Sequence, residues 1–99
     1  MSETGQRFFV YILHCVDGTY YVGSTADVTA RVEIHNSGQG PRFTASRRPV
    51  RLVHSAPFDT MAEARLREIQ IKKWSRAKKE ALISGDIQVL HSLSRRHQP

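Results

Sequence analysis

The segment FFVYILHCVDGTYYVGS, residues 8–24, decides the fold of this 99-residue chain. Two runs of aromatic and β-branched residues lie on either side of Asp17-Gly18. An Asp-Gly pair in this setting is the strongest short-range indication of a β-hairpin, because glycine accepts the positive φ that a tight turn requires. We therefore predict two antiparallel strands, residues 8–14 and 19–24.

The length of the hairpin loop decides which side chains share a face of the sheet. A two-residue loop would place Tyr11 and Tyr21 on opposite faces. A three-residue loop over residues 16–18, with Gly18 left-handed and a G1 bulge, pairs Leu13 with Tyr21 and puts both tyrosines on one face. A slip of one residue exchanges the two faces, so only this register allows a shared site. We predict the three-residue loop.

A helix is predicted directly after the hairpin, over residues 27–36. Four side chains recur there at the i, i+3, i+4 and i+7 positions of one helical face: Val28, Arg31, Val32 and His35. This helix brings a guanidinium and an imidazole into the neighbourhood of the two phenols. Thr25 or Asp27 is a suitable N-cap, and Gly38 lies where helices often end. Residues 37–48 are predicted to be a loop.

A third strand and a long helix follow. Residues 50–56 have the composition of a strand, which Pro57 closes. Thr60 and Glu63 have the spacing of a capping box and open the long helix. Two neighbouring stripes run along it, Ala62, Leu66, Ile69 and Lys73 in one and Ala64, Glu68 and Ile71 in the other. We place the second stripe at the edge of the buried side.

The last predicted helix covers residues 76–84, between a Ser75 cap and Gly85. The resulting order ββαβαα predicts an α/β fold of the α+β kind, with a small three-stranded antiparallel sheet flanked by helices. We expect a flexible N-terminus over residues 1–7, one folded domain over 8–84, and a C-terminal extension and tail over 85–99. A last turn of that extension can dock through Ile87, Val89, Leu90 and Leu93.

Composition bounds the class of protein. A chain of 99 residues with 39% hydrophobic and 24% charged residues suits a single domain with one modest core. A net charge of +6 favours a polyanionic partner, with nucleic acid first and an anionic membrane surface second. Cys15 is the only cysteine, which excludes an intrachain disulfide and suits a reducing cytoplasm. The apolar run 8–13 is too short to span a membrane.

Two short motifs in the hairpin carry a family resemblance. Phe-Val-Tyr at residues 9–11 and Tyr-Val-Gly at residues 21–23 resemble the GIY-YIG nuclease signature, with the first motif degenerate. The resemblance covers residues 8–84 and is closest to the small stand-alone bacterial group. It continues through Arg31, His35-Asn36 and Glu68.

The resemblance implies an endonuclease that hydrolyses phosphodiester bonds. Glu68 would hold one Mg²⁺ or Mn²⁺, and such an ion needs only one or two protein carboxylates. Arg31 would bind the scissile phosphate, and His35 would hydrogen-bond a tyrosine or a phosphate oxygen. Tyr21, rather than Tyr11, is our expected general base. A phenol titrates near pH 10, so this role requires cations that stabilise the phenolate.

The same residues also have ordinary structural interpretations. Glu68 could be a helix carboxylate that pairs with Lys72 at i+4. Tyr11 and Tyr21 could pack a sheet, as tyrosines commonly do. Arg31 could form a salt bridge or lay its stem along apolar surface.

Basic side chains on both sides of the expected site predict contacts to a nucleic-acid backbone, DNA in the first place. One cluster comes from the loop and third strand, the other from the helical end: Arg42, Arg47, Arg48 and Arg51, then Lys72, Lys73, Arg76, Lys78 and Lys79. No element resembles a base-reading helix, so we expect little sequence specificity. A non-catalytic nucleic-acid-binding module, or an adaptor for a protein partner, is the alternative. The substrate form and oligomeric state stay open.

Overall fold

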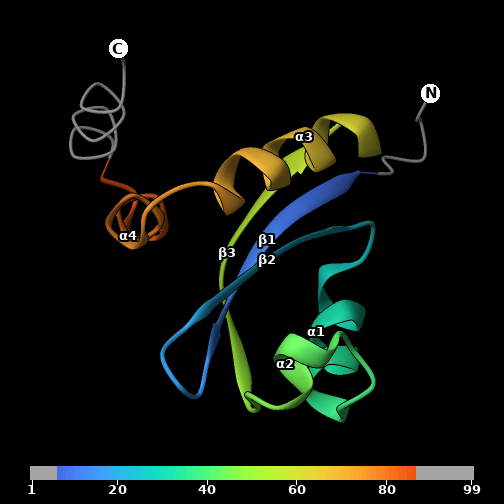
Figure 1. Ribbon diagram of the computed structural model, residues 1–99. Helices are drawn as coiled ribbons and strands as arrows, with labels where there is room; N and C mark the ends of the chain where they lie inside the picture. Colours follow the sequence, from blue (N-terminus) through green and yellow to red (C-terminus); the bar gives the residue numbers. More distant parts are fainter. Residues whose placement is uncertain (1–6, 87–99) are drawn as a thin grey trace.

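The computed structural model describes residues 7–86, and its centre is an antiparallel sheet of three strands (Figure 1). The strands are β1 (Phe8–Cys15), β2 (Tyr20–Thr25) and β3 (Val50–Phe58), in the order β2-β1-β3. β1 therefore lies in the middle, and its residues from 10 to 13 are no more than 1% exposed. The predicted sheet is confirmed, and β2 and β3 are its two edges.

The hairpin between β1 and β2 has the predicted three-residue loop. Leu13 faces Tyr21 and Tyr11 faces Gly23 across the ladder. Gly18 has a φ of +88°, the left-handed conformation that this loop requires. Successive side chains of a strand point to opposite faces, so this register puts both tyrosines on the same face of the sheet.

Two helices lie between β2 and β3. Helix α1 (Val28–Ser37) begins at Asp27, whose carboxylate accepts a hydrogen bond of 3.0 Å from the Ala30 amide. The short helix α2 (Arg42–Ala45) replaces part of the loop predicted over residues 37–48. That prediction was wrong there because a helix of a single turn has no detectable hydrophobic period.

β3 continues beyond the predicted end of the strand. Pro57 lies opposite Phe9, and Phe58 lies opposite Phe8 at the end of the ladder. The prediction that Pro57 closes the strand was therefore wrong. Because β3 is an edge strand, it tolerates a residue that has no amide hydrogen.

The two helices after β3 begin and end close to the predicted positions. In the capping box of α3 (Met61–Lys72), the Thr60 hydroxyl accepts from the Glu63 amide and the Glu63 carboxylate accepts from the Thr60 amide. Helix α4 (Arg76–Ser84) is capped by the Ser75 hydroxyl and followed by a left-handed glycine. Local hydrogen bonds of single side chains set these boundaries.

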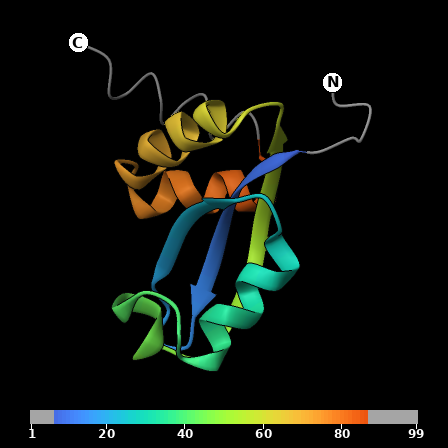
Figure 2. The same cartoon turned by 90° about the vertical axis from the view of Figure 1, so that its right-hand side faces the viewer.

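The sheet separates two small hydrophobic cores (Figure 2). On one face, the residues of α3 and α4 cover Val10, Ile12 and Val22. On the other face, α1 and α2 lie over a group made of Tyr11, Leu13, Cys15 and Val50. Each face of β1 thus supports a different pair of helices.

Helix α3 turns the stripe of Glu68 toward the sheet. Ala64 and Ile71 are fully buried, whereas Leu66 is 63% and Ile69 46% exposed. The stripe of Ala64, Glu68 and Ile71, which we placed at the edge of the buried side of the helix, lies at the centre of that side. Two stripes of similar composition are indistinguishable by period alone, and packing against β1 and β2 selects one of them.

None of the helices formed by residues 7–86 has the length and apolar character needed to cross a bilayer. The flexible N-terminus predicted over residues 1–7 and the last turn predicted for the C-terminal extension fall almost entirely outside the described residues.

Candidate active site

The candidate site straddles the edge strand β2, between α1–α2 on one face and α3 on the other (Figure 1). Alternation along β2 directs Tyr21 toward α1 and α2, and Ser24 toward α3. Gly23 lies between them and has no side chain. Groups from both faces of the sheet can therefore meet at this edge.

Tyr11, His35 and Thr44 form a buried chain of hydrogen bonds. The Tyr11 hydroxyl lies 3.0 Å from Nε2 of His35, and Nδ1 of His35 lies 2.8 Å from the Thr44 hydroxyl. The three residues are no more than 1% exposed. The imidazole is thus held at both nitrogens and has no rotational freedom.

Gly23 makes room for the Tyr11 phenol. A Cβ atom at this position would lie 2.5 Å from the Tyr11 hydroxyl oxygen and 2.7 Å from the carbon that bears it. Any residue with a side chain would push the phenol away from His35. The glycine of the second motif is therefore required by a close approach, with no need for a positive φ.

Tyr21 lies beside this chain but is not part of it. Its ring centroid is 5.0 Å from that of His35 and 6.3 Å from that of Tyr11. Within residues 7–86, the structure offers no hydrogen-bond partner to the Tyr21 hydroxyl. The half-buried ring also contacts Phe43 of α2, with centroids 6.1 Å apart. The hydroxyl is consequently available to a ligand or to water.

The two phenols and the imidazole favour their neutral forms. Burial raises the pKa of Tyr11 well above its ordinary value, and the neighbouring Tyr21 raises it further. Burial also raises the pKa of Tyr21, against which the charges of Lys72 and Arg31 act. Burial and the charge of Arg31 lower the pKa of His35. At neutral pH, His35 is therefore an uncharged imidazole with one nitrogen able to accept.

Glu68 is held on the α3 side of the edge. The Ser24 hydroxyl donates to Oε1 at 2.6 Å, and the Lys72 ammonium lies 2.8 Å from Oε2. Burial raises the pKa of Glu68, but the hydrogen bonds from Lys72 and Ser24 outweigh it and leave the pKa below its usual range. The i, i+4 pair with Lys72 thus exists, yet the carboxylate is only 14% exposed and its charge acts on both tyrosines.

The donor atoms around Glu68 fit a hard divalent cation better than a soft one. A carboxylate and the Ser24 hydroxyl are oxygen donors, and Mg²⁺ or Mn²⁺ takes most of its remaining ligands from water and phosphate. Zinc needs three or four protein ligands, and residues 7–86 contain no cluster of three metal-binding side chains. Lys72 is half exposed, so its ammonium can move into solvent and release Oε2.

Arg31 lies on α1 and is exposed. Its charge lowers the pKa values of Tyr11, Tyr21 and His35, so the guanidinium is within electrostatic reach of all three. No described residue accepts a hydrogen bond from it or pairs with it. All its donors are therefore available, as the binding of a phosphate would require.

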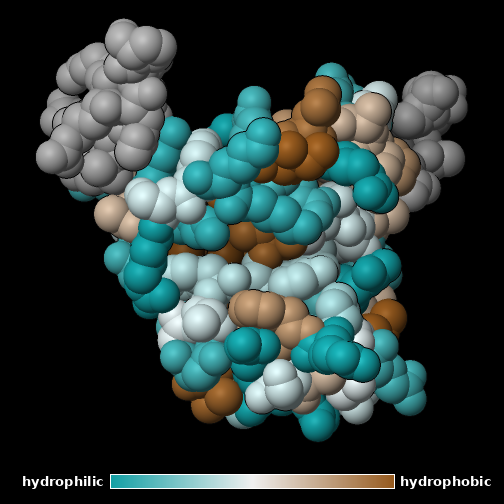
Figure 3. Space-filling view, viewed as in Figure 1, coloured by the Kyte–Doolittle hydropathy of each residue, from teal (hydrophilic) through white to brown (hydrophobic). Residues whose placement is uncertain are grey.

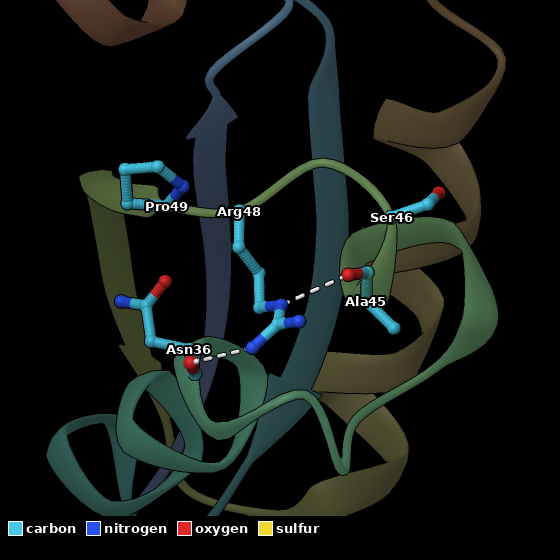
Figure 4. Close-up of a pocket in the computed structure, with 5 residues that line it drawn as sticks. All are labelled: Asn36, Ala45, Ser46, Arg48 and Pro49. Carbon is cyan, nitrogen blue, oxygen red and sulfur yellow. Dashed lines mark hydrogen bonds between the residues drawn. The ribbon is translucent and has the colours of Figure 1, made fainter.

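Two of the predicted nucleic-acid contacts hold α2 in place. The Arg47 guanidinium pairs with Asp17 at 3.0 Å and lies 3.9 Å from the ring centroid of Phe43. The Arg48 guanidinium donates to the carbonyl oxygens of Ala45, at 2.9 Å, and Asn36. Figure 4 shows Arg48 in the middle of the shallow pocket between these two residues. Both arginines tie the segment around α2 to its neighbours.

Within residues 7–86, two basic residues of the helical end are also engaged in internal contacts, whereas two residues of each cluster are not. Arg76 pairs with Glu80 at 3.0 Å and donates to the Gly18 carbonyl oxygen at 2.7 Å, while Lys78 lies over the Trp74 ring. A second group makes no side-chain hydrogen bond or ion pair to any described residue: Arg42, Arg51, Lys73 and Lys79. Hydrophilic side chains cover much of the face that carries α3 and β2 (Figure 3).

Three residues of the site were not predicted. Thr44 and Phe43 lie in α2, for which the sequence has no recognisable period. Ser24 could have been found, because it follows the second motif directly and alternation places it on the face opposite Tyr21. Asn36, part of the family resemblance, instead binds the backbone of Val50 through both ends of its amide.

Fold and site together define a small α+β domain with two tyrosines, an arginine, a histidine and a glutamate around an edge strand. Residues 7–81 match the sequence model of the GIY-YIG catalytic domain. The chain belongs to the GIY-YIG family, which is part of a nuclease superfamily.

Relatives of similar length support the same assignment. A UPF0213 protein of Halobacterium salinarum is 53% identical over 73 residues, which are 74% of this chain and 95% of the relative. A UPF0213 protein of Staphylococcus aureus (strain Mu3) is 52% identical over 75 residues, or 76% and 92% of the two chains. The small stand-alone group that the sequence resembles thus includes an archaeal member.

Two solution NMR structures share the fold. The UPF0213 protein BH0048 from Bacillus halodurans has a TM-score of 0.53 and 44% identity. The protein EF2693 from E. faecalis has a TM-score of 0.57 and 38% identity. Each comparison covers 81% of this chain and 85% of the other. The predicted fold class agrees with both.

Proposed function

We propose that this protein is a divalent-metal-dependent endonuclease that hydrolyses phosphodiester bonds in nucleic acid, DNA in the first place, with little intrinsic sequence specificity. One observation carries the proposal. Four separate elements, β1, β2, α1 and α3, bring one set of side chains to the same strand edge: Tyr11, Tyr21, Arg31, His35 and Glu68. The charge of Arg31, whose guanidinium has no partner among the described residues, acts on both phenols, and the charge of Glu68 acts on the same two phenols.

Glu68 would hold Mg²⁺ or Mn²⁺, with Ser24 orienting its carboxylate through the hydrogen bond to Oε1. When bound, such an ion supplies positive charge that stabilises the charge developing on a phosphate under attack. A low pKa supports this role, because Glu68 stays ionised across the physiological range.

The side chains of the chain itself have separate tasks. The unpaired guanidinium of Arg31 would bind the scissile phosphate and stabilise its developing charge. Tyr21 would accept the proton of the attacking water, because its hydroxyl has no partner within residues 7–86 and two cations, Lys72 and Arg31, favour its phenolate. Tyr11 suits this task less, since its hydroxyl is engaged by His35 and its pKa is raised further.

Backbone contacts would come first from the basic side chains without internal partners. Arg42, Arg51, Lys73 and Lys79 belong to this group. Contacts to phosphates bind every sequence similarly and weaken with salt, because they release condensed counterions. The other basic side chains would also contact phosphates while they keep their internal contacts: Arg47, Arg48, Arg76 and Lys78.

A non-catalytic nucleic-acid-binding module or an adaptor for a protein partner is the second candidate. One observation favours it: both oxygens of Glu68 already have partners, Oε1 in Ser24 and Oε2 in Lys72. A carboxylate satisfied in this way can serve the structure without any metal.

A cleavage assay paired with a binding assay separates the two candidates. The substrates are supercoiled plasmid, branched DNA, single-stranded DNA and RNA, each with Mg²⁺, Mn²⁺ or EDTA. We expect cleavage in either metal and none in EDTA. Glu68→Gln should reduce it by roughly 100-fold or more, since metal-centred charge stabilisation is worth several kcal/mol. Binding of the same substrate should survive.

Glu33→Gln is the matched control, because it makes the same change of carboxylate to carboxamide at an exposed position of α1. This variant should cleave normally. Unchanged cleavage by Glu68→Gln would refute the metal assignment. Binding without cleavage of any substrate by the wild-type protein would favour the binding module.

A further inference from the structure

Thr44 is the partner of the one imidazole nitrogen that faces away from the tyrosines. Its hydroxyl oxygen lies 2.8 Å from Nδ1 of His35, and both residues have no exposed surface. The backbone of Gly40 closes over the pair, since a Cβ atom there would lie 3.0 Å from Nδ1 and 3.4 Å from the Thr44 hydroxyl oxygen. Thr44 is therefore positioned to control this nitrogen without competition from solvent.

A count of hydrogens links the directions of these hydrogen bonds. A threonine hydroxyl has one hydrogen, and two acceptors lie within its reach, the Pro41 carbonyl oxygen at 3.2 Å and Nδ1 of His35 at 2.8 Å. When the hydroxyl donates to Pro41, its oxygen accepts from Nδ1–H of His35. A neutral imidazole carries one N–H, so Nε2 is then bare and accepts from the Tyr11 hydroxyl.

We propose that Thr44 is a positioning residue of the nuclease site, which keeps the proton of His35 on Nδ1 and thereby directs the Tyr11 hydroxyl hydrogen to Nε2. This inference rests on the proposed function for its catalytic meaning. The Tyr11 oxygen then presents only lone pairs to the strand edge over Gly23. There it can accept a hydrogen bond from the attacking water and orient it, while Tyr21 takes the proton.

The opposite tautomer would have a different effect on the site. With the hydrogen on Nε2, His35 would donate to Tyr11, and the phenol would direct its own hydrogen toward the strand edge. A donor at that place competes with water for the phosphate oxygens, and with one lone pair engaged by His35 the phenol is a poorer acceptor for the water's hydrogen. The tautomer of His35 thus decides whether Tyr11 acts as acceptor or donor.

Nitrogen-15 NMR of the His35 ring measures the tautomer directly, because protonated and bare ring nitrogens resonate far apart. The wild-type protein at neutral pH should show a protonated Nδ1 and a bare Nε2. Thr44→Ser keeps the hydroxyl and should show the same pattern. Thr44→Val keeps the shape but removes the acceptor, and most of the population should move to the Nε2–H form. Thr25→Val, at a buried threonine of β2, is the control for a lost hydroxyl.

Kinetics supply the functional readout. Thr44→Val should lower kcat by roughly 10- to 100-fold, by analogy with the loss that follows removal of the outer partner of a metal-bound histidine. KM should change little, because Thr44 touches no substrate, and Thr44→Ser should recover most of the rate. Thr25→Val should lose stability with kcat nearly unchanged.

Two results would overturn the proposal. One is a wild-type ring with its hydrogen on Nε2, a measurement that needs no variant and stands even if Thr44→Val does not fold. The other is a folded Thr44→Val protein with the wild-type ring pattern or the wild-type kcat. If the wild-type protein cleaves nothing, the proposed function fails, while the ring spectra still decide the role of Thr44.

Discussion

The Tyr11 hydroxyl and Nε2 of His35 share a buried hydrogen bond of 3.0 Å, although the two residues are 24 positions apart in the chain. One belongs to the central strand and the other to the last turns of α1. The bond joins the first motif of the hairpin to the helix that follows it, and Gly23 leaves the space in which it forms. It fixes Tyr11 and His35 relative to one another on the face of the sheet that α1 and α2 cover.

Gly23→Ala should disturb this contact first. The added methyl group would meet the Tyr11 hydroxyl oxygen at 2.5 Å, so the phenol must move from His35. Such overpacking costs about 1–3 kcal/mol of unfolding free energy. Urea denaturation should show this loss, and cleavage should fall with it.

Gly18→Ala is the control for that substitution. It is also destabilising, because Gly18 has a positive φ, yet nothing lies within 4 Å of the added methyl group. Its cleavage should remain near the wild-type rate. Equal losses of cleavage in the two variants would show that stability alone, rather than the position of Tyr11, limits the rate.

Lys72→Met should strengthen the binding of a divalent cation. The Lys72 ammonium lies 2.8 Å from Oε2 of Glu68, so a metal ion must displace it. Loss of this half-exposed pair removes roughly 0.5–1 kcal/mol of competition, which corresponds to about a two- to fivefold gain in affinity. Paramagnetic broadening of Glu68 and Ser24 by Mn²⁺ measures it. Lys73→Met, the exposed neighbour, should leave the affinity unchanged.

Arg42 and Arg48 should respond differently to replacement by alanine. Arg42 has no internal partner among the described residues, so Arg42→Ala should weaken binding equally across sequences and reduce the salt slope by about one. Arg48 donates to two carbonyl oxygens, and Arg48→Ala should lower the unfolding free energy by about 1 kcal/mol or more. Binding at several salt concentrations and urea titration check the pair. A sequence-dependent loss for Arg42→Ala would contradict the backbone assignment.

Stability should fall as the pH drops below neutral. Burial and Arg31 lower the pKa of His35 from 6.5, and burial and Arg67 lower that of His54. Between 6.5 and the lower folded values, the unfolded chain binds more protons, so the free energy of unfolding rises with pH in this window.

Urea titrations from about pH 7.5 down to about 5 measure the effect, above the range where the carboxylates with lowered pKa titrate. His54→Gln removes one contribution, and the slope that remains belongs to His35. A stability independent of pH in this range would show that His35 is not kept neutral by the fold.

The sequence by itself determined the hairpin register and most helix boundaries. Asp17-Gly18 marks the turn, and the requirement that Tyr11 and Tyr21 share a face selected the three-residue loop that the structure shows. The Thr60–Glu63 capping box sets the start of α3. The position of the turn and the start of the helix depend on residues near one another in the chain, so turn geometry and capping chemistry predict them, whereas the loop length also required the expectation of a shared site.

Only the tertiary structure decided which partners each site residue has. Thr44 reaches His35 through a single helical turn without a period of its own, and Ser24 meets Glu68 across 44 positions of chain. Arg48, which we predicted to contact phosphates, donates hydrogen bonds to two backbone carbonyl oxygens. Contacts of this kind arise when separate elements pack on the two faces of β1, and no spacing along the chain encodes them.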